Sequence, residues 1–369
     1  MKILRVAPDI YPYSVGGLGI HTHQMSKHQA GLGHEVTVFS SLKNSSEKKI
    51  EHTSGYKIVR HKELLNIYGN SISLEKFFSL NETFDNYDII HAHSHLFFST
   101  NITSLIRKFK NETPLVITSH GLIPVSGPEV LYQIFLPTLA NWTFNNSDAV
   151  LCYTDDQKKK LAEVTKTNQE KIHVVPNGID TDLFYSNPIP HNNFRIFWVG
   201  RMVERKGVWE LVQVFKQLIN GYDNIELHLA GRGPLENRIR NFVVKNSLED
   251  SVRFHGFIDY EEMPKVYNSC DLFVLPSHHE GVPKSVLEAM ACGLPIVMTE
   301  MEHLRDLMEG CGLTHPKGDL ESIREKIKDF LTNRDMLREM GNNCTKKIQR
   351  NYNWKNTVEK TTKIFKTLV

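Results

Sequence analysis

The sequence has no excess of either charge and no apolar run of membrane length. Its 369 residues include 44 Lys and Arg against 42 Asp and Glu, a formal net charge of +2. Neutralising the phosphates of a nucleic acid needs a much larger basic excess, so nucleic acid is excluded as an expected partner. No stretch approaches the roughly 20 apolar residues of a membrane span, and residues 1–14 lack the apolar core of a signal peptide. We therefore expect a cytoplasmic protein.

Cysteine is scarce and scattered. The cysteines are odd in number and form no C-x-x-C motif, which excludes a disulfide framework and a zinc knuckle and predicts reduced thiols. They are Cys152, Cys270, Cys292, Cys311 and Cys344. A composition of 40% hydrophobic and 23% charged residues is that of a folded globular protein. At about 150 residues per domain, the length predicts roughly two domains.

Short runs rich in Val, Ile and Leu alternate with longer amphipathic stretches, which is the pattern of parallel βαβ units. The first unit predicts a strand at 2–7, a glycine-containing loop at 8–19, a helix at 18–32 and a strand at 35–40. Further strands are expected at 88–92, 114–118, 149–153 and 172–175. Together they predict one doubly wound sheet in the first half of the chain.

A stretch rich in Asn, Ser and Pro at 185–193 predicts an interdomain linker. A second series follows, with strands expected at 195–199, 226–230, 252–254, 272–275 and 296–299 and helices at 208–219, 235–245, 261–268 and 284–291. The fold class is therefore α/β, with two Rossmann-like doubly wound parallel-sheet domains, 1–185 and 194–353, facing across a cleft. The last segment has an apolar face formed by Trp354, Val358, Ile364 and Phe365, and periodicity leaves open which domain this helix covers.

Glycines, charges and helix starts gather at the carboxyl ends of the predicted strands, where ligands bind in open α/β sheets. Gly16-Gly17-Leu18-Gly19 follows the first strand and opens a helix. Its backbone suits the close approach of an anion, although a tight turn between strand and helix explains the glycines equally well.

Histidines follow two other strands of the first half. His120, in Thr118-Ser119-His120-Gly121, is placed to point into the cleft and exchange a hydrogen bond near neutral pH, or else it is a packing residue. In His91-Ala92-His93-Ser94-His95, alternate residues share one face of a strand, as ligands of a metal would. No carboxylate lies in that segment, so a structural or substrate-lining role is favoured and no metal site is predicted.

Two loops of the second half combine glycine with cations or an aromatic residue. In the loop 200–207, Arg201 and Lys206 lie beside a helix N-terminus and suit a diphosphate, the alternative being a solvated charged loop. The turn at Gly231 and the segment containing Phe257 and Ile258 suit a nucleobase, or are ordinary turns.

The segment 280–293 carries the strongest signal. Glu280 lies in a loop before a helix, and Glu288 lies inside that helix. The free N–H groups around Lys284, Ser285 and Val286 suit a phosphate, which leaves the two carboxylates to bind hydroxyls on either side.

The motifs, taken in order, resemble family 4 of the retaining, nucleotide-sugar-dependent glycosyltransferases, which have the two-domain GT-B fold. The resemblance covers essentially the whole chain. Its motifs are Gly16-Gly17-x-Gly19, Asp88-Ile-Ile-His91-Ala-His93-Ser94, Ser119-His120-Gly121, Val175-Pro-Asn177-Gly178-Ile-Asp180, Gly200-Arg201 with Lys206-Gly207, Ala230-Gly231-x-Gly233-Pro234, and the pair Glu280 and Glu288.

The resemblance implies a role for each matching position. It implies that Gly16, Gly17, Arg201 and Lys206 hold the donor diphosphate, and that His120 sits over the sugar. Glu288 would bind the ribose hydroxyls, Glu280 the sugar hydroxyls, and the loop at Phe257-Ile258 the base. The sugar and phosphate would also contact the backbone of Gly281, Val282, Pro283, Lys284, Ser285 and Val286. The resemblance also implies that the helix 354–369 returns to the first domain.

The resemblance implies transfer of a hexose-type sugar from a UDP- or GDP-linked donor to a hydroxyl acceptor, without a cofactor or catalytic metal. The sequence has Glu280-Gly281-Val282-Pro283 where the family often has Glu-Gly-Phe-Gly, which leaves the donor open. A sugar-nucleotide 2-epimerase and a non-catalytic nucleotide-sugar-binding protein are the alternatives.

Two segments of the first half raise the question of a membrane. The apolar segment 131–144 and the basic, aromatic cluster 106–110 suit either an ordinary core and surface helix or peripheral contact with a lipid-linked acceptor at the inner membrane face.

Overall fold

The computed structural model describes residues 1–13, 16–42, 49–67, 70–110, 112–121 and 134–369. The chain divides into two compact units, one formed by Met1–Gly178 with Trp354–Val369 and the other by Ile179–Asn353. The segment expected to be a linker therefore belongs to the second unit. Within that unit the backbone N–H of Asn187 donates to Asn268 Oδ1, and the N–H of Ile189 donates to the Asn268 carbonyl.

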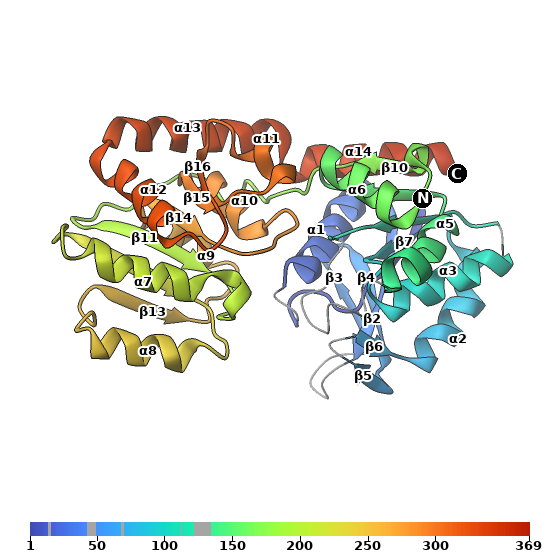
Figure 1. The fold of residues 1–369 in the computed structure, drawn as a ribbon. Helices are drawn as coiled ribbons and strands as arrows, with labels where there is room; N and C mark the ends of the chain where they lie inside the picture. The colour runs from blue at the N-terminus through green and yellow to red at the C-terminus, as the bar shows by residue number, and fades with distance from the viewer. Residues whose placement is uncertain (14–15, 43–48, 68–69, 111, 122–133) are drawn as a thin grey trace. The chain divides into compact units, whose positions relative to one another are not determined.

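Unit 1 is built on an eight-stranded sheet of order β10-β9-β8-β7-β1-β2-β4-β3, parallel except where the edge strand β3 pairs with β4 (Figure 1). The strands are β1 (Lys2–Val6), β2 (Glu35–Leu42), β3 (Ile50–Thr53), β4 (Tyr56–Lys62), β7 (Ile89–His93), β8 (Leu115–Thr118), β9 (Ala149–Cys152) and β10 (Ile172–Val174). A separate hairpin joins β5 (Leu65–Ile67) to β6 (Asn70–Ile72).

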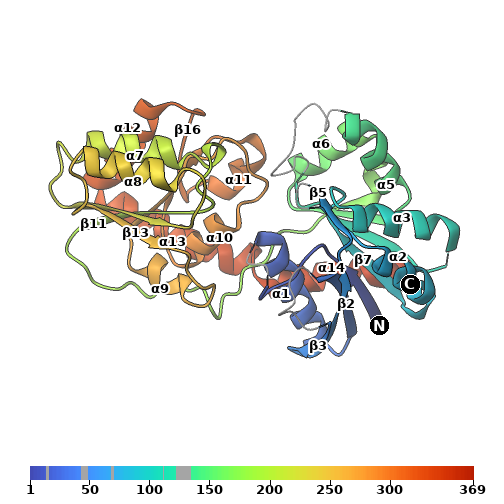
Figure 2. The ribbon, with the colours of Figure 1, turned by 90° about the horizontal axis from the view of Figure 1, so that it is seen from below.

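Helices cover both faces of this sheet. On one face lie α1 (Gly17–Gly31) and α14 (Trp354–Leu368), which pack on each other (Figure 2). The other face is covered by α2 (Leu74–Thr83), α3 (Phe98–Lys110), η2 (Leu136–Ala140), α5 (Asn141–Asn145) and α6 (Asp155–Thr165). Two short 3₁₀ turns, η1 (Phe84–Asn86) and η3 (Gln169–Lys171), complete the unit.

Alternation along the strands supplies two cores. Ile3 and Ile89 join the core beneath α14, whereas Leu4 and Ile90 join the core beneath α2 and α3. The central strands β1 and β7 thus bury both of their faces, which is why their sequences are mostly apolar runs.

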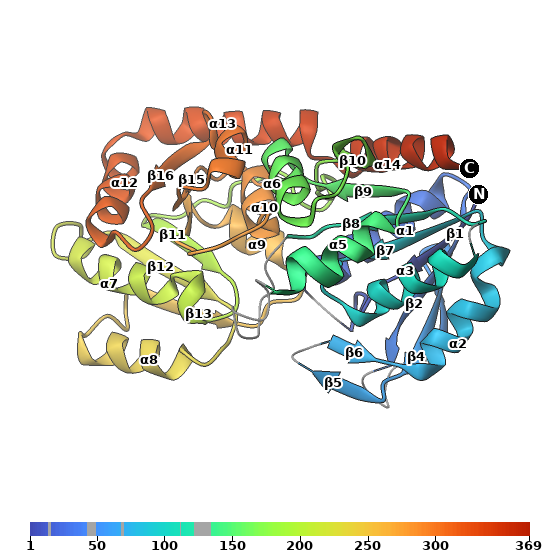
Figure 3. The ribbon, with the colours of Figure 1, turned by 45° about the vertical axis from the view of Figure 1, so that its right-hand side comes forward.

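Unit 2 has a six-stranded, fully parallel sheet of order β13-β12-β11-β14-β15-β16 (Figure 3). The strands are β11 (Phe194–Val199), β12 (Ile225–Ala230), β13 (Val252–Gly256), β14 (Leu272–Leu275), β15 (Ile296–Thr299) and β16 (Gly312–His315). The helices are η4 (Glu204–Lys206), α7 (Val208–Leu218), α8 (Glu236–Lys245), α9 (Met263–Asn268), α10 (Lys284–Ala291), η5 (Glu302–Leu304), α11 (Arg305–Met308), α12 (Leu320–Thr332) and α13 (Arg334–Asn351).

Most predicted elements agree with the structure to within one or two residues. The sequence analysis did not predict β3, β4, β5, β6 or β16. These are short or lie in segments rich in charged and polar residues, so they lack the apolar run of a central strand. All five cysteines are buried and free, in agreement with the expectation of unpaired thiols. Among the described residues no helix is both long and apolar enough to cross a membrane.

Candidate donor site and histidine cluster

Three loops of unit 2 meet closely at the carboxyl ends of β11, β12 and β14. The missing side chains of two glycines allow this contact. A Cβ on Gly231 would lie 1.9 Å from the Gly200 carbonyl oxygen, and a Cβ on Gly207 would lie 2.0 Å from the Pro276 carbonyl oxygen. Both glycines also have a left-handed backbone, with φ of +112° and +66°. Gly231 therefore allows two loops to pack closely, as expected of an ordinary turn. This packing is also compatible with a ligand at the same edge of the sheet.

The two cations of the first loop differ in what they contact. Lys206 Nζ lies 2.5 Å from Glu280 Oε1, a contact that joins η4 to the loop before α10. Arg201 is exposed and makes no side-chain hydrogen bond or ion pair with another described residue. Its guanidinium is thus available to an anionic ligand, whereas Lys206 orients a carboxylate.

Helix α10 begins at Lys284, directly after Pro283, and no side chain caps its N-terminus. The first backbone bonds of the helix run from Val286 and Leu287 to the Pro283 carbonyl. The N–H groups of Lys284 and Ser285 are therefore among those that an α-helix leaves without an internal acceptor. Gly293 follows the helix with φ of +82°, as expected for a residue that ends a helix.

Glu288 is buried on α10, with 6% of its surface exposed. Tyr267 Oη lies 3.0 Å from Glu288 Oε2, and Lys284 Nζ lies 3.6 Å from Glu288 Oε1. Lys284 also donates to Tyr260 Oη at 2.8 Å and lies over that ring. Burial raises the pKa of Glu288 and lowers that of Lys284 to about 8. Both groups are removed from water, so a polar ligand group placed beside them would change their pKa values.

The remaining predicted residues of unit 2 lie in the surrounding loops. His303 Nε2 lies 2.9 Å from the Gly281 carbonyl oxygen and 3.1 Å from the Glu280 carbonyl oxygen, which fixes the backbone that precedes Val282. Phe257 is 57% exposed, and Ile258 beside it is half-buried. An exposed aromatic ring next to a strand end suits stacking on a base.

Gly16, Gly17 and His120 belong to unit 1. Gly16 is the N-cap of α1, which begins at Gly17 without a side-chain cap, so the first N–H groups of this helix are available to an anion. His120 is half-buried, and both of its ring nitrogens have protein partners. His120 Nε2 lies 3.0 Å from His93 Nδ1, and His120 Nδ1 lies 2.7 Å from Tyr153 Oη.

The histidines of the segment 91–95 have different hydrogen-bond partners, although the rings of His91 and His93 lie 4.4 Å apart. His93 lies beside His120 and His21, with ring centroids 5.3 Å and 5.5 Å away. His91 Nε2 instead bonds Thr118 Oγ1 at 2.7 Å. His95 packs against Phe144, and its burial lowers its pKa to about 3. Alternation along one strand therefore does not define a metal site here.

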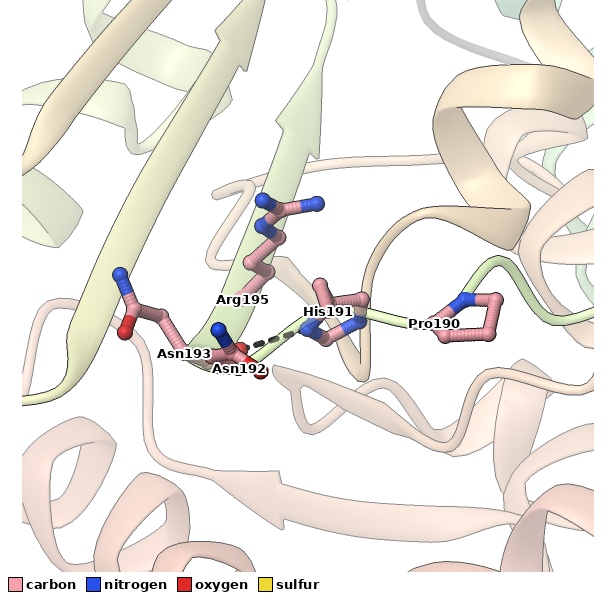
Figure 4. Close-up of a pocket in the computed structure, with 5 residues that line it drawn as sticks. All are labelled: Pro190, His191, Asn192, Asn193 and Arg195. Carbon is pink, nitrogen blue, oxygen red and sulfur yellow. Dashed lines mark hydrogen bonds between the residues drawn. The ribbon is translucent and has the colours of Figure 1, made fainter.

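A pocket of about 420 Å³ lies at the amino end of β11 (Figure 4). It is lined by Pro190, His191, Asn192, Asn193 and Arg195, and His191 Nδ1 contacts the Asn193 carbonyl oxygen at 2.6 Å. Since the glycine loops and both glutamates lie at the other end of the strands, this pocket is not the predicted donor site.

The basic cluster on α3 has little unpaired charge. Arg107 pairs with Asp148, and Lys110 pairs with Asp85. Phe109 is 77% exposed, and Ile134 is 62% exposed on the neighbouring apolar segment, of which residues 131–133 lie outside the described residues.

Sequence reasoning missed the partners that hold these residues in place. Tyr267, Tyr260 and His303 surround α10, and Tyr153, Asn177 and His21 surround His120 and His93. They come from separate elements, and no spacing in the sequence marks them.

Two Rossmann-like parallel sheets, with glycines, cations and paired glutamates at the carboxyl ends of the second, define the class of GT-B glycosyltransferases. The chain belongs, more closely, to the family 4, group 1 glycosyltransferases, which use a nucleotide sugar. Residues 180–347 match the model described as glycosyl transferases group 1, and residues 15–183 match the model described as glycosyltransferase family 4.

Relatives and solved structures agree with this assignment. The chain is 26% identical over 380 residues to an uncharacterized glycosyltransferase of Methanocaldococcus jannaschii, covering 100% of this chain and 99% of that protein. It is 22% identical over 398 residues to glycogen synthase of Mycobacterium tuberculosis, covering 99% of this chain and 94% of that protein.

Among solved structures, Anabaena HepE in complex with UDP and glucose has a TM-score of 0.82, 18% identity and 100% coverage of both chains. Sucrose-phosphate synthase from Thermosynechococcus elongatus has a TM-score of 0.79 and 22% identity, covering 100% of this chain and 98% of that one. At these identities the similarity shows the fold.

Proposed function

We propose that this glycosyltransferase moves a hexose-type sugar, with retention of configuration, from a UDP- or GDP-linked donor to a hydroxyl acceptor. The observation that carries the proposal is the pair of glutamates framing the uncapped start of α10. Glu280 is held by Lys206, and Glu288 is held by Tyr267 and Lys284. The HepE complexes with UDP and with UDP-glucose support a UDP-linked sugar as the first donor to test.

Each side chain has a proposed role. Glu288 accepts hydrogen bonds from the ribose hydroxyls, and Glu280 from the sugar hydroxyls, because ionised carboxylates are acceptors only. Phe257 and Ile258 receive the base. Gly231 and the backbone of residues 281–286 line the sugar and diphosphate.

The chemical task is to break the anomeric C–O bond while negative charge grows on the departing diphosphate. Arg201, Lys206 and the N-terminus of α10 supply positive charge for it, so the proposed reaction needs no catalytic metal. Removing one such donor is expected to raise the barrier by about 2.7–4 kcal/mol.

We propose same-face attack by the acceptor hydroxyl, whose proton passes to the departing phosphate. The Lys206 contact favours a binding role for Glu280 over that of a covalent nucleophile, because a paired carboxylate is a weaker nucleophile. The roles that the resemblance implies for Gly16, Gly17 and His120 of unit 1 stay predictions. The product would be a cell-surface glycan, glycolipid or polysaccharide made on the cytoplasmic side. The exposed apolar side chains of Phe109 and Ile134 support peripheral contact with a lipid-linked acceptor.

The experiment that tests this function measures nucleotide binding by calorimetry, with UDP, GDP, ADP and their sugar conjugates. We expect one nucleotide class to bind the wild type and Glu288→Gln to bind it at least about tenfold more weakly, a loss of about 1.4 kcal/mol. The matched control is Glu262→Gln, an exposed glutamate of the same unit that pairs with Lys265. Equal binding by wild type and Glu288→Gln would refute the ribose assignment.

Product analysis separates transfer from its alternatives. Incubation of the donor alone should leave it intact, and adding a hydroxyl acceptor should release the nucleoside diphosphate. A donor epimerised at carbon 2 without acceptor would identify the 2-epimerase. Tight binding with neither reaction, across glycan and lipid acceptors, would favour the non-catalytic nucleotide-sugar-binding protein.

A further inference from the structure

We propose that unit 1 binds one transition-metal ion of the Zn²⁺ class between His21, His93 and His120. One ring nitrogen of each histidine lies within 4.8 Å of one ring nitrogen of each of the others. His21 lies on α1, His93 ends β7, and His120 follows β8. The three residues come from separate parts of the sequence, and the fold of unit 1 alone brings them together.

Two of the nitrogens already have nearly the spacing of ligands. His93 Nδ1 and His120 Nε2 are 3.0 Å apart. Nitrogen ligands 2.0–2.1 Å from a tetrahedral Zn²⁺ lie about 3.3 Å from each other. An ion can therefore replace the proton that these two rings share, with a displacement of a few tenths of an ångström. The His21 nitrogen lies within 4.8 Å of the other two, so it must move by up to about 1.5 Å to reach the ligand spacing of about 3.3 Å.

The hydrogen bonds behind two of the ligands match those of built metal sites. His120 Nδ1 lies 2.7 Å from Tyr153 Oη, and His21 Nδ1 lies 2.8 Å from Asn177 Oδ1. Each oxygen can accept the ring N–H, which leaves Nε2 as the lone-pair nitrogen that faces the ion. Partners of this kind fix the tautomer and orientation of ligating histidines.

The surroundings select the kind of ion. The ligand group contains three imidazoles and no carboxylate. Imidazole suits Zn²⁺, Co²⁺, Ni²⁺ and Cu²⁺, whereas Mg²⁺ and Ca²⁺ prefer oxygen ligands. His21 and His93 are buried, and the ring centroids of Trp354 and His21 are 5.1 Å apart. His120 is only half-buried, so it gives the ion a path from solvent. Three protein ligands leave a fourth position for water or another small ligand.

Titration calorimetry with ZnCl₂ on the full, metal-free chain tests this inference without donor or acceptor. We expect one Zn²⁺ per chain, abolished by His21→Gln and by His120→Gln, and no binding of Mg²⁺. Tyr153→Phe keeps all three ligands and the ring, so it should weaken Zn²⁺ binding by about 10–100-fold through the lost hydrogen bond alone. Replacing Zn²⁺ by Co²⁺ should give the intense visible absorption of a tetrahedral site.

The matched control is His255→Gln. His255 Nε2 contacts His228 Nδ1 at 3.1 Å, so this pair in unit 2 resembles the pair His93 and His120 but belongs to no group of three ligands among the described residues. Zn²⁺ binding unchanged in His21→Gln and His120→Gln, or lost in His255→Gln, would overturn the proposal, as would the absence of stoichiometric binding. Circular dichroism of the variants shows that each is folded. His120 also has an implied role in the transfer reaction, so the titration is run without donor or acceptor and reports Zn²⁺ binding apart from nucleotide binding by the α10 residues of unit 2.

Discussion

Burial of charged side chains is the main feature of the candidate donor site at the scale of single residues. Glu288 and Lys284 lie one helical turn apart on α10, and both are almost fully removed from water. Their attraction opposes the cost of desolvation, but the pKa shifts show that burial dominates for both groups. A ribose hydroxyl placed against Glu288 would add a hydrogen bond to the ionised form and so favour it.

The lowered pKa of Lys284 predicts how stability changes with pH. Its ordinary value of 10.5 falls to about 8 in the folded protein. Between these two values the unfolded chain binds the proton and the folded chain does not. The contribution of this group to the free energy of unfolding therefore rises with pH across that window, by at most about 1.4 kcal/mol per pH unit.

Chemical denaturation of wild type and Lys284→Met at several pH values measures this contribution. The stability of the wild type relative to Lys284→Met should increase from pH 8 to pH 10.5. The control is Lys265→Met, because the Lys265 side chain is 69% exposed. The difference in free energy of unfolding between wild type and Lys265→Met should change little over the same pH range. Parallel curves for wild type and Lys284→Met would contradict the prediction.

At the scale of elements, close contact between loops positions the candidate donor site. The turn after β12 rests on the loop after β11, and the start of α7 rests on the segment after β14. No side chain fits at either contact. Glycines in these turns therefore decide where the cations and the N-terminus of α10 lie.

Gly231→Ala is expected to separate these loops. Its Cβ would lie 1.9 Å from the Gly200 oxygen, at a φ of +112° that side chains rarely adopt. We expect a loss of at least about 2 kcal/mol of stability and weaker nucleotide binding. Gly221→Ala is the control, because the nearest atom to its Cβ would be the Leu218 oxygen at 3.9 Å. Thermal unfolding and calorimetry check both, and equal behaviour of the two variants would disprove the packing role of Gly231.

At the scale of the whole molecule, the chain ends by completing its first unit. Trp354 and Val358 pack on Met25 of α1, and Phe365 lies in the core beneath the sheet of unit 1. A Cβ on Gly178 would lie 2.7 Å from the Trp354 ring, so the end of the first segment is also fitted to α14. Unit 1 therefore depends on residues that follow unit 2 in the sequence.

Phe365→Ala should destabilise unit 1 alone. Removing this fully buried ring is expected to cost about 3–5 kcal/mol. Hydrogen exchange should accelerate in β1, β2, β7 and α1 and stay as in wild type in β11, β12, β14 and β15. Phe109→Ala, which removes a ring that is 77% exposed on α3, should change neither unit. Faster exchange throughout unit 2 in Phe365→Ala would argue against a local role for α14.

The sequence by itself determined the features that depend on local patterns. Buried parallel strands are continuous apolar runs, so β1, β11 and β14 could be placed from composition, and the helix expected at 284–291 is α10. The polar strands β3 and β4 gave no such signal: β4 owes its burial to its place beside β2, and β3 is the edge strand that pairs with β4.

Only the tertiary structure decided which side chains meet. The sequence predicted a diphosphate role for Lys206, which stays a prediction, and the fold adds its contact with Glu280. The sequence grouped His93 with its neighbours on one strand, and the fold groups it with His21 and His120 from other elements. Periodicity reports the face on which a residue lies, but contacts between elements depend on how helices and strands pack, which no local pattern encodes.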